Sequence, residues 1–188
     1  MKNKSILITV SIVASFAAAL SLAISGAQNQ DKYTLQIPGG LAFSEFKGYE
    51  NWEVISASQH AETIAVIVGN PVIINAFKSG IPGNGKPFPD GSRMAKIHWN
   101  AKVNPDVPGS PLMPVSQHDV DFMVKDSKRF ADGHGWGYGA FELDPASNTF
   151  RPANTTDKPP QEHDAQCGVE CHDAAHNRDY VFTHYMPK

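Results

Sequence analysis

The chain has 188 residues, and its 19 acidic and 16 basic side chains give a formal net charge of −3. A slightly acidic chain without a basic stripe is not expected to bind nucleic acid. Two cysteines are too few for a disulfide-rich scaffold, whereas the length is ample for one domain with a buried core.

The N-terminal segment has the pattern of a secretory signal. Lys2 and Lys4 give a basic start, an apolar stretch covers residues 6–24, and small residues follow where a signal peptidase cleaves. The apolar stretch is nearly long enough to span a bilayer, so a retained membrane anchor is the alternative. We expect residues 1–27 to be a signal peptide and residues 28–188 a single periplasmic or secreted domain without membrane contact.

The elements predicted after the leader are short and follow one another closely. Aromatic side chains predict a first short amphipathic helix at Phe43, Phe46 and Tyr49. Asn70 followed by Pro71 is typical of a helix start. Alternating or β-branched patterns predict strands over residues 52–56, 63–68, 93–103, 119–124 and 136–143. Loops are predicted where glycine, proline or polar residues dominate, over residues 79–91, 104–114 and 144–166.

These strands lie close together in the sequence, without the long helical crossovers that parallel pairing requires. We therefore predict an α+β fold, mainly an antiparallel β-sheet of about five strands with short helices on one face. Within the strand over residues 93–103, alternation places Met94, Lys96 and His98 on one face and apolar side chains on the other.

Both cysteines belong to one string near the C-terminus, Cys167-Gly168-Val169-Glu170-Cys171-His172. It is one residue longer than the C-x-x-C-H string of c-type haem attachment. This interpretation predicts one covalently bound haem c, with Cys167 and Cys171 as thioether sites and His172 as the proximal iron ligand. The additional residue need not prevent attachment, because the segment can bulge by one position while both sulfurs still reach the ring edge.

Two other structures fit the same residues. Cys167, Cys171, His172 and His176 offer four ligands of the types that bind zinc. Alternatively, the two cysteines form a small disulfide in an oxidising compartment. Metal analysis together with a pyridine haemochrome assay separates these possibilities.

Further strings resemble those of the cytochrome P460 family, which includes the cytochromes c′-beta. The matching strings are residues 88–96, residues 124–130, the cysteine string and residues 179–183, and the resemblance runs from about Trp52 to Tyr185. It implies an exported, mostly antiparallel protein, commonly a homodimer, whose five-coordinate haem iron is open on its distal side. The P460 members carry a lysine joined to the haem ring, oxidise hydroxylamine and bind nitric oxide, whereas the c′-beta members lack this link.

Lys96 matches the cross-linking lysine of the family by its position after the Asp90-Gly91 turn. The alternative is an ordinary strand lysine whose ammonium lies in solvent. If its face of the strand meets the haem, the amine would lose solvation, and the neutral, nucleophilic form would be favoured.

The residues of the distal side are less well defined. Oxidation of hydroxylamine requires a group that accepts protons near the iron. Candidates for this general base, each with an ordinary surface role as its alternative, are Glu162, His163, Asp164, Arg93 and His98. Candidates for the pocket wall, with core packing as the alternative, are Phe88, Phe141 and Trp136.

The resemblance predicts an exported mono-haem c-type cytochrome that acts on hydroxylamine or nitric oxide. A small redox protein would accept its electrons, and the chain would form a homodimer. The alternatives are a c′-beta-like protein that binds nitric oxide without turnover, and an electron carrier. The carrier requires a sixth iron ligand, for which Met186 is the candidate.

Overall fold

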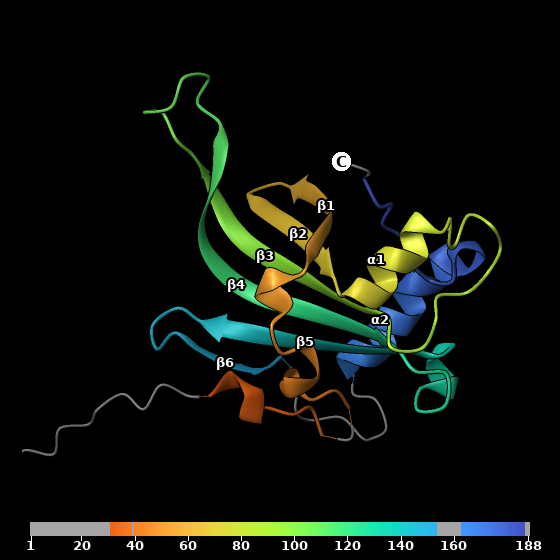
Figure 1. Cartoon of the computed structure of the whole chain (residues 1–188). Coiled ribbons are helices and arrows are strands. Elements are labelled where there is room, and N and C mark those ends of the chain that lie inside the picture. Colours follow the sequence, from red (N-terminus) through yellow and green to blue (C-terminus); the bar gives the residue numbers. More distant parts are fainter. Residues whose placement is uncertain (1–30, 39, 154–162, 187–188) are drawn as a thin grey trace, which may run out of the picture.

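The computed structural model describes residues 31–38, 40–153 and 163–186 (Figure 1). The predicted signal peptide, residues 1–27, lies outside these residues. Within the described part, no helix is both long enough and apolar enough to cross a membrane.

One six-stranded sheet forms the body of the molecule, and each strand pairs antiparallel with the next in sequence order. The strands are β1 (Glu53–His60), β2 (Thr63–Gly69), β3 (Arg93–Val103), β4 (Leu112–Lys125), β5 (Trp136–Asp144) and β6 (Thr149–Pro152). The α+β prediction with an antiparallel sheet is confirmed. Short connections join β1 to β2, β3 to β4 and β5 to β6, since a hairpin joins antiparallel neighbours directly. Residues 70–92, which include a helix, connect β2 to β3.

The largest differences from the predicted strands concern β4 and β6. β6 lies inside the segment predicted as a loop, because four residues are too few to show an alternating pattern. β4 begins at Leu112 and includes Pro114, in a segment predicted as a connector. Proline is tolerated there because the register with β3 shifts beside it and leaves Val115 as an extra residue, which is a β-bulge.

Two α-helices lie on the same face of the sheet (Figure 1). They are α1 (Pro71–Lys78) and α2 (His163–His172), and the 3-10 helix η5 (Asp173–Arg178) continues from α2. α1 begins where predicted, because the side chain of Asn70 accepts a hydrogen bond from the backbone N–H of Ile73. Shorter 3-10 helices are η1 (Lys32–Thr34), η2 (Phe43–Phe46), η3 (Tyr49–Asn51) and η4 (Ala131–Gly133).

The opposite face of the sheet is covered by the N-terminal segment. The predicted helix at Phe43 is replaced by the separate turns η2 and η3, but the predicted aromatic side chains are buried. Phe46 stacks on Phe122 of β4 with ring centroids 4.0 Å apart. Ala95 and Ile97 of β3 pack on this face, whereas Met94 packs with the helices, so the predicted alternation of β3 is confirmed.

Asn70 connects the start of α1 to the start of β3. Its Oδ1 accepts hydrogen bonds from the N–H groups of Ile73 and Arg93, both at 3.1 Å, and its Nδ2 donates to the carbonyl of Gly91 at 2.9 Å. We predict that Asn70→Ala lowers the free energy of unfolding by about 2 kcal/mol, because it leaves these backbone groups without partners. Urea denaturation measures the effect. Asn75→Ala, at an exposed position of α1, is the control, and an equal loss in both variants would contradict the prediction.

Candidate functional site

α2 presents both cysteine side chains on one helical face. The helix is continuous from His163 to His172, so Cys167 and Cys171 are four residues apart, about 6 Å along the axis. Residues three or four apart lie on the same side of a helix, and both thiols are exposed. No bulge is needed, because the helical period itself accommodates the additional residue.

Gly168 allows α2 to lie close against β5. A Cβ atom at this position would come within 2.7 Å of the ring carbon Cγ of Tyr138. Real Cβ contacts are longer, so any side chain here would push the helix away from the sheet. Tyr138 is buried, and its ring also contacts the ring of His172, with centroids 5.0 Å apart.

His172, the last residue of α2, has a defined orientation and tautomer. Its Nδ1 lies 2.6 Å from the carbonyl oxygen of Tyr180. Because a carbonyl only accepts, Nδ1 carries the proton and donates it, and Nε2 keeps its lone pair for another partner. The ring also contacts Phe182, with centroids 5.1 Å apart.

The electrostatic surroundings keep the His172 imidazole neutral. Burial lowers the pKa of His172, and the positive charge of Lys96 acts in the same direction, against the opposing effect of the hydrogen bond to Tyr180. A neutral imidazole is the form that ligates a metal ion. Nε2 of His172 is therefore available to ligate a metal ion.

A buried ion pair supports the turn that carries the Tyr180 carbonyl. Lys125 Nζ lies 2.8 Å from Asp179 Oδ1, and the two side chains are only 7% and 11% exposed. The other carboxylate oxygen of Asp179 accepts the N–H of Phe88 at 2.7 Å. The indole of Trp136 donates to the Asp179 carbonyl at 2.9 Å. These contacts stabilise Asp179 and Tyr180, which both have positive φ angles.

A cavity of about 180 Å³ lies beside His172 and is lined by β2, β3, β4, β5 and the C-terminal segment. Its wall is mainly apolar, with Ile67, Met94, Met123 and Val181 among its members. A larger cavity of about 750 Å³ lies between the loop after α1 and the end of the chain, and none of the predicted site residues lines it.

Lys96 and Asp121 contribute polar groups to the same cavity as His172. They are directly paired across β3 and β4, so their side chains leave the sheet on the same face. Lys96 is half-buried, and the side chain of Asp121 is 48% exposed. The structure thus brings together Lys96, His172 and a carboxylate that the sequence analysis did not identify. The alternation of β4 could have suggested Asp121, but its pairing with Lys96 depends on a register that the sequence does not reveal.

The other distal candidates lie elsewhere. His98 is on the same face of β3 as Lys96 but does not line the cavity, and Arg93 lines a separate cavity with Glu45 and Asp90. Glu162 lies outside the described residues, as do the side chains of His163 and Asp164. The aromatic candidates for the wall belong to the hydrophobic cores instead: Phe88 and Trp136 on the helical face, and Phe141 on the other.

The predicted zinc ligands do not converge. Among the described residues, the group of three ligating side chains whose ligand atoms come within 4.8 Å of one another is His98, Asp119 and Asp121. None of Cys167, Cys171, His172 and His176 belongs to it. By contrast, two thiols on one helical face, a neutral imidazole with Nε2 available and an adjacent apolar cavity form a donor set that fits haem.

A sequence model of the family described as Cytochrome P460 matches residues 46–183. The chain belongs to the cytochrome P460 family. The match confirms the resemblance found in the sequence, and membership makes the protein a haem cytochrome. No curated protein matches the chain. Two of the family strings now have a structural role, because residues 124–130 include Lys125 and residues 179–183 begin with Asp179, the partners of the buried ion pair.

Breaking this ion pair is expected to damage both the fold and the haem site. Asp179→Asn leaves the buried Lys125 ammonium without its counterion, which typically costs about 3–5 kcal/mol. We predict this loss in the free energy of unfolding, measured by chemical denaturation of the purified cytochrome, together with weaker haem incorporation. The control is Glu142→Gln, which removes the exposed ion pair with Arg151 and should cost less than about 1 kcal/mol. Equal stability of the two variants would contradict the prediction.

Proposed function

We propose that this cytochrome is an exported mono-haem c-type oxidoreductase that oxidises hydroxylamine or a closely related small nitrogen compound. The observation that supports this function best is the shared cavity of His172, Lys96 and Asp121. Bound haem supplies an electron acceptor and an open coordination position for the nitrogen compound. Export rests on the predicted signal peptide, and it suits covalent attachment of haem c in the periplasm.

In this proposal, Cys167 and Cys171 hold the haem through thioether bonds and His172 ligates its iron through Nε2. Both thiols are exposed on one helical face, so they are accessible to the attachment machinery. The hydrogen bond from Nδ1 to Tyr180 keeps the imidazole plane in a fixed orientation and increases the basicity of the ligand. Tyr138 and Phe182 contact the ring and restrict its rotation.

Lys96 is proposed as the residue that joins the haem ring covalently. Its half-buried side chain lines the cavity beside His172, and its charge already acts on the pKa of that histidine. Such a position would hold the amine against a ring bound in the cavity. Replacing one N–H bond of the amine and one C–H bond of the ring with a C–N bond releases two protons and two electrons, so the reaction would require a two-electron oxidant such as a peroxide.

Asp121 is proposed as the proton acceptor. Oxidation of an N–H or O–H group releases protons, and a carboxylate within the cavity can accept them as a general base. Because this side chain is 48% exposed, water can then remove the proton from the site. Electrons leave to a small redox protein.

A c′-beta-like protein that binds nitric oxide without turnover is the second candidate. The mainly apolar wall of the cavity favours it, because a neutral diatomic gas needs few polar partners. The electron carrier has less support, since Met186 is 55% exposed and does not line the cavity.

We also propose that the chain forms a homodimer. The hairpin of β3 and β4 projects beyond the other strands (Figure 1). Near its tip, Val103, Met113 and Val115 are exposed large apolar side chains. Apolar groups gathered in this way favour contact with another protein surface.

The Lys96→Arg variant tests the cross-link. Arginine keeps the charge but cannot form the bond, so we predict that the absorption band of the native cytochrome lies to the red of the variant's ordinary c-type band. The mass of the haem peptide should show a third attachment point, at Lys96, in the native protein alone. Lys102→Arg, at an exposed position of β3, is the control. If the native protein and Lys96→Arg have the same absorption spectrum and yield haem peptides of the same mass, the cross-link is rejected and the c′-beta alternative is favoured.

The Asp121→Asn variant tests turnover. Asparagine has nearly the same shape but does not accept a proton, so we predict that kcat for hydroxylamine-dependent reduction of an acceptor dye falls about a hundredfold. The haem content, measured as pyridine haemochrome, should not change. Asp106→Asn, at an exposed position, provides the control. If the native cytochrome binds nitric oxide but shows no hydroxylamine-dependent reduction, the gas-binding function replaces the proposed one.

A further inference from the structure

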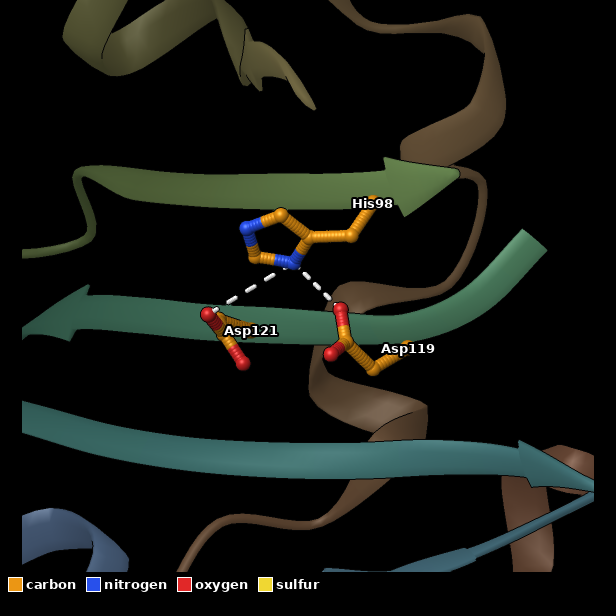
Figure 2. Close-up of side chains that lie close together, drawn as sticks. All are labelled: His98, Asp119 and Asp121. Carbon is orange, nitrogen blue, oxygen red and sulfur yellow. Dashed lines mark hydrogen bonds and ion pairs between the residues drawn. The ribbon is translucent and has the colours of Figure 1, made fainter. Parts of the chain in front are cut away.

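A second cluster of polar side chains lies on the same sheet face as Lys96, two residues further along β3. His98 is paired with Asp119 of β4, just as Lys96 is paired with Asp121. Figure 2 shows both carboxylates directed toward Nδ1 of His98. This nitrogen is hydrogen-bonded to Asp119 Oδ1 and lies 3.8 Å from Asp121 Oδ2.

A β-bulge adds a second histidine to the cluster. His98 pairs with Asp119 but Trp99 pairs with Gln117, so His118 is an extra residue in β4. A bulge redirects the side chains around it. Nδ1 of His118 lies 2.9 Å from Asp119 Oδ2, and its ring stacks on that of His98 with centroids 5.7 Å apart. Without the bulge, His118 and Asp119 would point to opposite faces.

Two carboxylates converge on a single imidazole nitrogen in this cluster. Nδ1 of His98 carries at most one proton, which forms a good hydrogen bond with one carboxylate at a time, yet two carboxylates face it. A divalent cation would interact with both carboxylates and neutralise their combined charge. The side chains of His98 and Asp119 are only 14% and 23% exposed, so these groups are partly withdrawn from water.

The spacing also suits a small cation. Zinc binds imidazole nitrogen and carboxylate oxygen at about 2.0–2.2 Å, which places two ligand atoms of a tetrahedral ion roughly 3.4 Å apart. The separation of His98 Nδ1 from Asp121 Oδ2 is 3.8 Å, close to this value. The hydrogen bond between His98 Nδ1 and Asp119 Oδ1 is shorter than this separation, so these two atoms must move apart when a cation binds. The cation would replace the proton that lies between them.

We propose that His98, Asp119 and Asp121 bind one divalent cation of the zinc type, while His118 holds the second carboxylate oxygen of Asp119. This site is separate from the proposed haem ligands but shares Asp121 with their cavity. A bound cation would therefore occupy the carboxylate that we propose as proton acceptor. This consequence rests on the proposed function and predicts that zinc slows hydroxylamine oxidation, whereas the site itself does not depend on that activity.

The experiment uses the full-length, haem-loaded cytochrome with zinc chloride as the probe, in equilibrium dialysis followed by metal analysis and in titration calorimetry. We expect one zinc ion per chain. Loss of groups that merely orient metal ligands already weakens binding by about 10–100-fold, so His98→Gln and Asp119→Asn should each raise the Kd by at least about tenfold. His60→Gln, at an exposed position of β1, is the matched control and should leave the Kd unchanged.

His98 and Asp119 are less exposed than Asp121, so substituting either of them could prevent folding. Asp121→Asn is the variant that still tests the site in that case. Its side chain is 48% exposed, and the variant should fold and also bind zinc at least about tenfold more weakly. Absence of stoichiometric zinc, or binding that all three variants retain at the native Kd, would overturn the proposal. Zinc binding that persists when hydroxylamine oxidation is absent would support the site and reject only the proposed activity.

Discussion

The ion pair between Lys125 and Asp179 is the interaction on which the candidate haem site depends. Removing two charges from water is costly, and the cost is offset only where hydrogen bonds satisfy the remaining polar atoms. Here the carboxylate also accepts a backbone N–H, and the ammonium donates to the carbonyl of His134. The pair joins the end of β4 to the turn after η5. Through the Tyr180 carbonyl, it determines the direction in which the imidazole of His172 points.

The pairing of β3 with β4 is the second constraint on function. It places Lys96 beside Asp121 and His98 beside Asp119, so one sheet face carries both the polar end of the cavity and the proposed cation site. The bulge at His118 lies at the boundary between regular pairing and the projecting hairpin. The same irregularity that changes the register therefore also concentrates ligating groups near the cavity beside His172.

The parts of the fold that were predictable carry strong local signals. Asn70-Pro71 marks the start of α1, and the alternation of residues 93–103 gives the bounds of β3 correctly. α2 was missed because the segment around the cysteines has little apolar periodicity and contains glycine. The thiols and His172 were recognisable as a motif. The position of Asp121 beside Lys96 could not be predicted in this way. It depends on the register of β3 with β4 and on two bulges that arise from tertiary packing.

The close contact between Gly168 and Tyr138 gives the longer cysteine string a structural meaning. In a C-x-x-C-H string the residue four before the histidine is the first cysteine, whereas here it is Gly168. Gly168 and His172 therefore share one helical face, and both contact the Tyr138 ring. The two thiols share the neighbouring face. The additional residue therefore moves the first thiol off the face that packs on the sheet. That face keeps Gly168, which allows the close approach to Tyr138, together with the proposed iron ligand His172.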